Sequence, residues 1–130
     1  MLTKITVADY MTKHVVTLTK EMDVFVAIQR LLTHKITNAP VLDGGGHLVG
    51  MFSERDCMRV VLEHAYNQGS TSKVSEFMTA EVSTVTLETS IVDLAENFQA
   101  SQVRSFPVLH DKKLVGIISR TDVLRALAAV

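Results

Sequence analysis

The sequence is poor in the residues on which several common classes of fold and site depend. It has one cysteine, Cys57, and no tryptophan, and aromatic residues make up only 5% of its 130 residues. A single cysteine forms no internal disulfide and supplies no thiol pair for a redox reaction or a zinc knuckle. The sequence therefore excludes a disulfide-stapled fold and a cysteine-rich zinc module.

Long apolar runs and an excess of one charge are also missing. The longest unbroken apolar stretch, Val24 to Ile28, is far shorter than a membrane span, and the first residues lead into no signal-type apolar region. The 13 basic and 14 acidic residues leave a formal net charge of -1, which disfavours a basic face for nucleic acid. We therefore expect a cytoplasmic protein that binds neither membrane nor nucleic acid.

What the sequence does contain is an internal repeat. The stretch VADYMTKHVVTLTKE (7–21) realigns on VSEFMTAEVSTVTLE (74–88), and the same order of motifs continues through both halves with a single gap. The two copies are predicted at residues 7–66 and 74–130, with a polar, turn-rich linker at 67–73. Such ordered similarity indicates a duplicated domain.

Each copy is predicted to run strand, helix, strand, strand, helix. β-Branched runs at 15–19 and 82–86 predict the first strands, and apolar residues spaced three and four apart predict the helices. The predicted hairpins pair 39–42 with 48–52, and 106–109 with 114–118. A copy of about sixty residues buries too little apolar surface to be stable alone. We therefore expect a mixed α/β (α+β) fold, in which two β-α-β-β-α repeats pack sheet to sheet with pseudo-two-fold symmetry.

One composite pattern occurs twice and covers nearly the whole chain. It runs V-x-[DE]-[YF]-M-T, V-x-T-[LV]-T, an amphipathic helix, P-V-L, and L-V-G-x-x-S-x-x-D-x-x-R. This pattern resembles a tandem pair of cystathionine β-synthase (CBS) domains, also called a Bateman module. The resemblance implies a regulatory or sensory module, not an enzyme, that binds an adenine nucleotide (AMP, ADP or ATP) between the repeats. It also implies a homodimer which, as a free-standing pair, signals to a separate and unidentified protein partner.

The best candidate site is the corner where a strand passes into the last helix of each copy. Ser53 with Asp56, and Ser119 with Asp122, lie at these corners, where unpaired N–H groups and the helix dipole favour an anion. Serine can donate to a phosphate oxygen, and the aspartate can accept from ribose hydroxyls; in the resembled family the matching residues have these roles. The same spacing is also that of a capping box, and both interpretations stay open.

The charges around the two corners differ. Arg104 and Arg120 flank the second corner, and the resemblance implies that the position of Arg104 faces the ligand phosphates. In the first copy, the position that matches Arg120 is Glu54. Because arginine is a fork-shaped phosphate donor, we predict the stronger phosphate site in the second copy. Arg55 is the cation nearest the first corner in the sequence. The alternative for Arg104 and Arg120 is that they are solvated surface charges.

An adenine base needs an apolar slot with backbone polar groups beside it. Thr17 and Thr84 are candidates to offer strand-end amides to the adenine edge. Six apolar residues are candidate walls of the slot: Ile36, Ala39, Pro40, Val103, Phe106 and Pro107. Each of these residues has an alternative interpretation as ordinary core or strand.

The sequence shows no arrangement of residues typical of a metal site or a catalytic centre, and it leaves one rival function open. The five histidines show no pairing at ligand spacing, and no serine, histidine and acid form a defensible triad, so we predict neither a metal site nor catalysis. The rival is a ligand-free dimerisation scaffold, in which the corners are only caps. Apolar stripes on the last helices would then serve dimerisation: Cys57, Met58, Val61, Leu62 and Ala65 in the first copy, and Val123, Leu124, Leu127 and Ala128 in the second.

Overall fold

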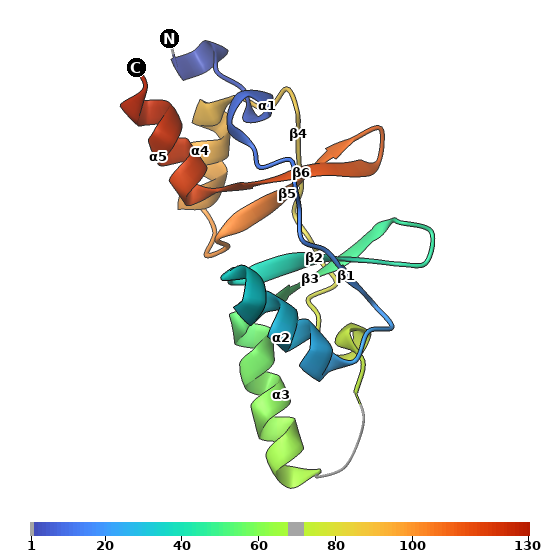
Figure 1. The fold of residues 1–130 in the computed structure, drawn as a ribbon. Helices are drawn as coiled ribbons and strands as arrows, with labels where there is room; N and C mark the ends of the chain where they lie inside the picture. The colour runs from blue at the N-terminus through green and yellow to red at the C-terminus, as the bar shows by residue number, and fades with distance from the viewer. Residues whose placement is uncertain (1, 68–71) are drawn as a thin grey trace. The chain divides into compact units, whose positions relative to one another are not determined.

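The chain folds into two compact units, seen in the computed structural model, which describes residues 2–67 and 72–130 (Figure 1). The first unit consists of residues 16–82, and the second unit combines residues 1–15 with 83–130. Each unit therefore takes its sheet and main helices from one sequence copy and a short leading segment from the other. Residues 68–71 of the predicted linker lie outside the described residues.

The first unit contains a three-stranded sheet with the order β1-β2-β3. Strand β1 is parallel to β2, and β2 forms an antiparallel hairpin with β3. The elements are β1 (Leu18–Thr19), α2 (Val24–His34), β2 (Asn38–Leu42), β3 (Leu48–Ser53), α3 (Glu54–Tyr66) and the 3-10 helix η2 (Val74–Glu76). This succession confirms the predicted β-α-β-β-α order for the first copy.

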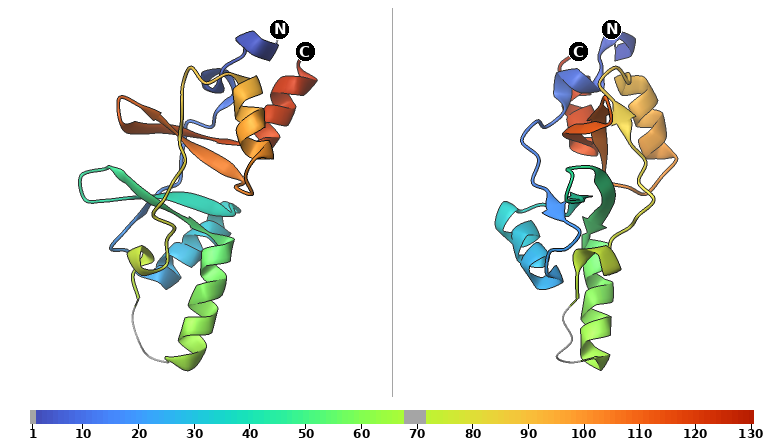
Figure 2. Two further views of the ribbon diagram at one scale, coloured as in Figure 1. Left: turned by 180° about the vertical axis from the view of Figure 1, so that it is seen from behind. Right: turned by 90° about the vertical axis from the view of Figure 1, so that its right-hand side faces the viewer.

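The second unit repeats the same topology, with sheet order β4-β5-β6. Its elements are β4 (Val85–Thr86), α4 (Ile91–Gln99), β5 (Ser105–His110), β6 (Lys113–Ser119) and α5 (Arg120–Ala128), preceded in the chain by η1 (Leu2–Lys4) and α1 (Val7–Tyr10). Figure 2 shows α4 and α5 side by side behind the β5–β6 hairpin. The mixed α/β prediction is confirmed in both units, while sheet-to-sheet packing of the repeats stays a prediction.

The first strand of each copy is shorter than predicted. Pairing covers only Leu18–Thr19 and Val85–Thr86, instead of the full runs 15–19 and 82–86. In each run only the last two residues meet the neighbouring strand, and the preceding residues carry the chain from one compact unit to the other. A β-branched run reports local preference for an extended backbone, whereas a strand also needs a hydrogen-bonding neighbour.

The apolar stripes of the last helices face the core only in part. Of the first stripe, Cys57 is buried, whereas Met58 is 58% exposed and Leu62 is 62% exposed, because α3 turns Cys57 and Val60 toward the core. In α5 the fully buried residue is Ala126, and the exposed large residues are Leu124 and Leu127. Across the described residues, the helices are too short or too polar to traverse a lipid bilayer.

The two leading segments close the edges of the sheets. In the first unit, Thr79 and Met51 exchange backbone hydrogen bonds of 2.8 and 2.9 Å, and in the second unit Thr12 and Ile117 exchange bonds of 2.8 and 3.0 Å. Each bridge is isolated rather than part of a full strand. Its two hydrogen bonds hold the M-T pair of one sequence copy against the sheet of the other.

Candidate ligand-binding corners

The first corner is the junction of β3 and α3, formed by Ser53 and Asp56. Ser53 is the N-cap of α3, and its extended backbone lets the chain turn from strand into helix. The Asp56 Oδ2 atom accepts hydrogen bonds from the Ser53 backbone N–H at 2.9 Å and from the Ser53 hydroxyl at 3.0 Å. In return the Asp56 N–H donates to the Ser53 Oγ at 3.3 Å.

The second corner, formed by Ser119 and Asp122 between β6 and α5, repeats this arrangement. Asp122 Oδ2 accepts from the Ser119 N–H at 2.7 Å and from its hydroxyl at 3.1 Å. The capping-box interpretation is therefore confirmed in both copies. It commits the single serine hydroxyl proton to the aspartate, so donation to a phosphate requires that the hydroxyl rotate. The phosphate and ribose roles of the four residues stay predictions.

Both aspartates are buried charges with an arginine three residues further on. Asp56 is 5% exposed and Asp122 is 3% exposed. The Nη1 of Arg59 lies 3.8 Å from Asp56 Oδ1, while Arg125 binds Asp122 Oδ1 directly through Nη2. Because a buried carboxylate is costly without a partner, these arginines support the corners. Sequence reasoning did not assign them this role, although the repeat places them at matching positions.

A second unforeseen partner reaches the first corner from a distant part of the sequence. The hydroxyl of Thr79 donates to Asp56 Oδ1 at 3.3 Å. Thr79 follows the 3-10 helix η2, so it comes from the leading segment of the second copy. The carboxylate of Asp56 thus joins the start of α3 to the segment that closes the sheet edge.

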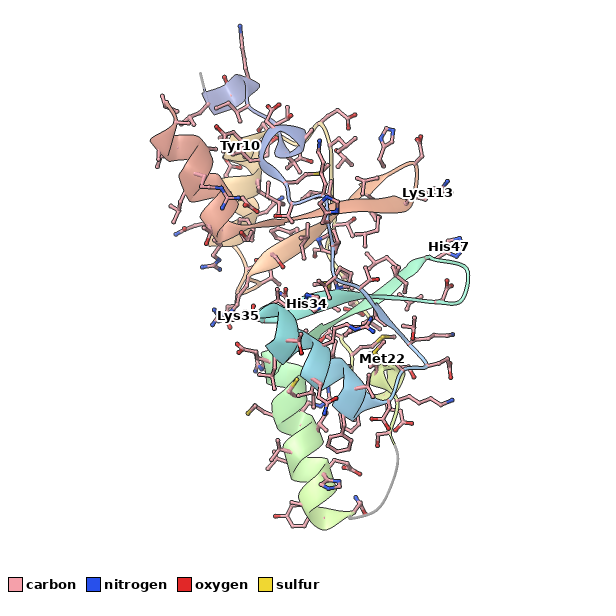
Figure 3. All side chains as sticks on the ribbon, viewed as in Figure 1. Tyr10, Met22, His34, Lys35, His47 and Lys113 are labelled. Atoms are coloured by element: carbon pink, nitrogen blue, oxygen red, sulfur yellow. The ribbon has the colours of Figure 1, made fainter. Side chains whose placement is uncertain are left out.

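Arg120 has a structural task at the end of α4. Its Nε donates to the Val103 carbonyl at 3.2 Å, its Nη2 donates to the carbonyls of Phe98 and Ser101 at 3.3 and 3.1 Å, and its guanidinium lies over the Phe98 ring. The first unit closes α2 differently, through Lys35 in a left-handed conformation with φ 55°; Figure 3 labels Lys35 at the end of that helix. The charge difference between the copies therefore includes a difference in helix capping.

The other predicted phosphate residues are exposed. Arg104 lies at the edge of the second corner, where its carbonyl accepts the Arg120 N–H at 3.4 Å. Arg55 lies in the first turn of α3, directly before Asp56. Their exposure leaves both side chains open to a ligand, and contact of Arg55, Arg104 and Arg120 with a phosphate stays a prediction.

Most of the predicted wall residues are occupied by core packing. Ala39, Pro40, Phe106 and Pro107 are buried, whereas Val103 is 41% exposed. Ile36 is partly buried against the core of the first unit. Thr17 offers a backbone carbonyl to Arg30 at 3.1 Å, and Thr84 is exposed. A base slot formed by these residues stays a prediction, for which Ile36 and Val103 have the most accessible side chains.

Cys57 is buried next to the first corner, as its place on the helix suggests. Burial, together with the neighbouring charge of Asp56, raises the pKa of its thiol to about 11. A thiol with so high a pKa stays protonated near neutral pH and is a poor nucleophile. Among residues 2–67 and 72–130, no three His, Cys, Asp or Glu side chains are grouped to hold a metal ion.

Replacing Arg120 by alanine is expected to lower the free energy of unfolding by about 1–2 kcal/mol, because the carbonyls that end α4 lose a charged donor. Equilibrium urea unfolding measures this change. Arg104→Ala is the matched control. The Arg104 side chain is exposed, and its loss should change the free energy of unfolding by less than about 0.5 kcal/mol. Equal stability of the two variants would contradict the capping role.

The comparisons with known proteins agree with this architecture. The sequence profile of the CBS domain matches residues 7–63 and 74–129. An uncharacterized protein of Methanocaldococcus jannaschii is 28% identical over 95% of this chain and 43% of its own length. The mitochondrial CBS domain-containing protein CBSX3 of Arabidopsis thaliana is 31% identical over 84% of this chain and 54% of its own length. The chain therefore spans about half the length of these two relatives.

Two solved structures with bound ligands have the same fold. CBSX2 of Arabidopsis thaliana in complex with AMP superposes with a TM-score of 0.84 at 29% identity, covering 96% of this chain and 97% of that chain. The CBS domain pair of MJ0100, in complex with 5′-methylthioadenosine and S-adenosyl-L-methionine, has a TM-score of 0.80 at 25% identity, covering 95% and 96%. With the profile matched in both halves and the fold shared throughout, the chain belongs to the CBS-domain family and carries a tandem pair of these domains.

Proposed function

We propose that the protein is a regulatory module that binds an adenine nucleotide, AMP, ADP or ATP, at its strand-to-helix corners and catalyses no reaction. The observation that carries the proposal is the duplicated buried carboxylate at the start of α3 and α5, held by a capping box through Oδ2 alone. The Oδ1 atom is left to partners that a ligand can replace. Support for the ligand class comes from similarity to the AMP complex of CBSX2.

The corners offer different chemistry to the two ends of a nucleotide. At each corner the aspartate Oδ1 accepts from ribose hydroxyls, and the first-turn amides face the phosphate. Arg104 adds an exposed cation at the second corner, where the first corner has Arg55 in its helix instead. We therefore propose that the second corner binds the phosphate more tightly, since a bidentate arginine strengthens phosphate recognition.

Regulation requires that the ligand favour one arrangement of the protein over another, since equal affinity for both shifts nothing. The exposed apolar residues of α3 and α5 support the further proposal of a homodimer or a protein partner. These residues are Met58, Val61, Leu62, Leu124 and Leu127. The same observation favours the second candidate function, a ligand-free scaffold for dimerisation.

Titration of the purified protein with AMP, ADP and ATP distinguishes the two functions. Differential scanning fluorimetry and calorimetry should show stabilisation by at least one nucleotide. A ligand that binds only the folded state adds RT ln(1 + [L]/Kd) to the free energy of unfolding. Native mass spectrometry of the untreated protein would identify a nucleotide carried through purification. No stabilisation and no heat at millimolar concentrations of all three nucleotides would favour the scaffold.

A further inference from the structure

We infer that the two corners are not equivalent in what they transmit: occupation of the first corner releases residues 74–82, whereas occupation of the second corner releases no such segment. This inference rests on the proposed nucleotide binding. The observation behind it is the hydrogen bond from the Thr79 hydroxyl to Asp56 Oδ1, at 3.3 Å. Thr79 is far from Asp56 in sequence, so this bond connects the corner to another part of the chain.

The number of acceptor positions on the carboxylate makes the ribose and Thr79 competitors. Each carboxylate oxygen accepts about two hydrogen bonds. Oδ2 of Asp56 already accepts two, both from Ser53. A ribose diol that donates both of its hydroxyls to Asp56 must use both positions of Oδ1. One of these positions is held by Thr79, whose hydroxyl is displaced when the diol binds.

At the second corner the equivalent competitor belongs to the same helix as the aspartate. Oδ1 of Asp122 accepts from Arg125, one turn further along α5. Thr12 occupies the position in the second unit that Thr79 occupies in the first, since each pairs with the sheet edge through an isolated bridge. Within the described part of the chain, the Thr12 hydroxyl donates no hydrogen bond to Asp122. A ligand there displaces an exposed arginine and leaves the leading segment in place.

The segment that Thr79 belongs to is one of the two stretches that carry the chain between the compact units. Its start is held by the Val74 N–H, which donates to the Met22 carbonyl at 2.9 Å, and its end by the bridge between Thr79 and Met51. The second unit resumes at Ser83, shortly after Thr79. Loss of the hydroxyl contact therefore acts on one of the two stretches through which the first unit is covalently joined to the second.

Hydrogen–deuterium exchange with AMP as the probe tests this inference, alongside calorimetry on the same samples. In the wild type, AMP should raise exchange in residues 74–82 roughly threefold and should not raise it in residues 7–15, where the Thr12 bridge lies. Thr79→Val keeps the shape of the side chain but removes the hydroxyl. It should raise exchange in 74–82 without ligand, abolish the further rise with AMP, and tighten AMP binding roughly threefold, within the range of one hydrogen bond.

Thr12→Val is the matched control and should behave as the wild type in every measurement. AMP binding with unchanged exchange in 74–82, or with equal changes in 74–82 and 7–15, would overturn the inference while leaving the proposed function intact. Weaker AMP binding by Thr79→Val would also overturn it, because Thr79 would then assist the ligand. Absence of heat with AMP, ADP and ATP alike in the wild type would instead refute the proposed function, and the inference with it.

Discussion

Asp122→Ala is expected to weaken AMP binding by about a hundredfold, equivalent to roughly 3 kcal/mol, because a carboxylate that accepts two ribose hydroxyls makes two charge-assisted hydrogen bonds. Asp56→Ala should weaken binding less, about tenfold, because its corner lacks the cation that Arg104 supplies and its Oδ1 is shared with Thr79. Isothermal titration calorimetry measures both changes.

Both substitutions also remove a helix cap, and this loss must be separated from the loss of a ligand contact. Removal of a cap costs about 1 kcal/mol of stability. Asp9 provides the control, because its carboxylate accepts from the Thr6 N–H at 2.9 Å in another capping box, at the start of α1. Asp9→Ala should lower stability and leave AMP affinity unchanged. If Asp56→Ala and Asp122→Ala bind AMP as tightly as Asp9→Ala, the aspartates are caps only and the nucleotide proposal fails.

Gly116→Ala and Gly50→Ala are each expected to destabilise the protein by about 2–3 kcal/mol, the cost of overpacking a close contact. A Cβ on Gly116 would lie 2.6 Å from the Met11 Sδ and 2.9 Å from the Thr12 carbonyl oxygen, and a Cβ on Gly50 would lie 2.6 Å from the Met78 Sδ and 3.0 Å from the Thr79 oxygen. The methionine side chain can move aside. The backbone oxygen cannot do so without breaking the bridge.

Gly44→Ala is the matched control for these two variants. Gly44 lies at the tip of the β2–β3 hairpin, where an added Cβ would meet no atom within 4 Å, and its substitution should change the free energy of unfolding by less than about 1 kcal/mol. Urea unfolding gives the three values, and hydrogen exchange should show loosening of 7–15 in Gly116→Ala and of 74–82 in Gly50→Ala. Stabilities equal to that of Gly44→Ala would show that the leading segments do not depend on these glycines.

The contacts between glycine and methionine could be predicted from the repeat only in part. The repeat aligns Gly50 with Gly116 and Met11 with Met78. A methionine at both aligned positions suggests a core or dimer-contact role. Nothing in the pattern indicates that the methionine of one copy packs on the glycine of the other. That exchange depends on the path of the whole chain, which short-range spacing does not encode.

Two further features depended on the same long-range information. The position of Arg120 after Ser119 predicts a phosphate ligand, which stays a prediction, but does not indicate that its guanidinium closes the end of α4 through the carbonyls of Phe98, Ser101 and Val103. Nothing in the sequence indicates a role for Thr79, because its partner Asp56 belongs to the other sequence copy. In each case the deciding contact joins segments that only folding brings together.

The sequence by itself determined the duplicated β-α-β-β-α order, the family and the capping boxes at both corners, because strand periodicity, helix periodicity and Ser-x-x-Asp spacing act between residues a few positions apart. Only the tertiary structure decided which leading segment closes which sheet, how the buried carboxylates are balanced and which faces of α3 and α5 remain exposed. Those outcomes depend on packing between distant segments, where burial and hydrogen-bond geometry override local preference.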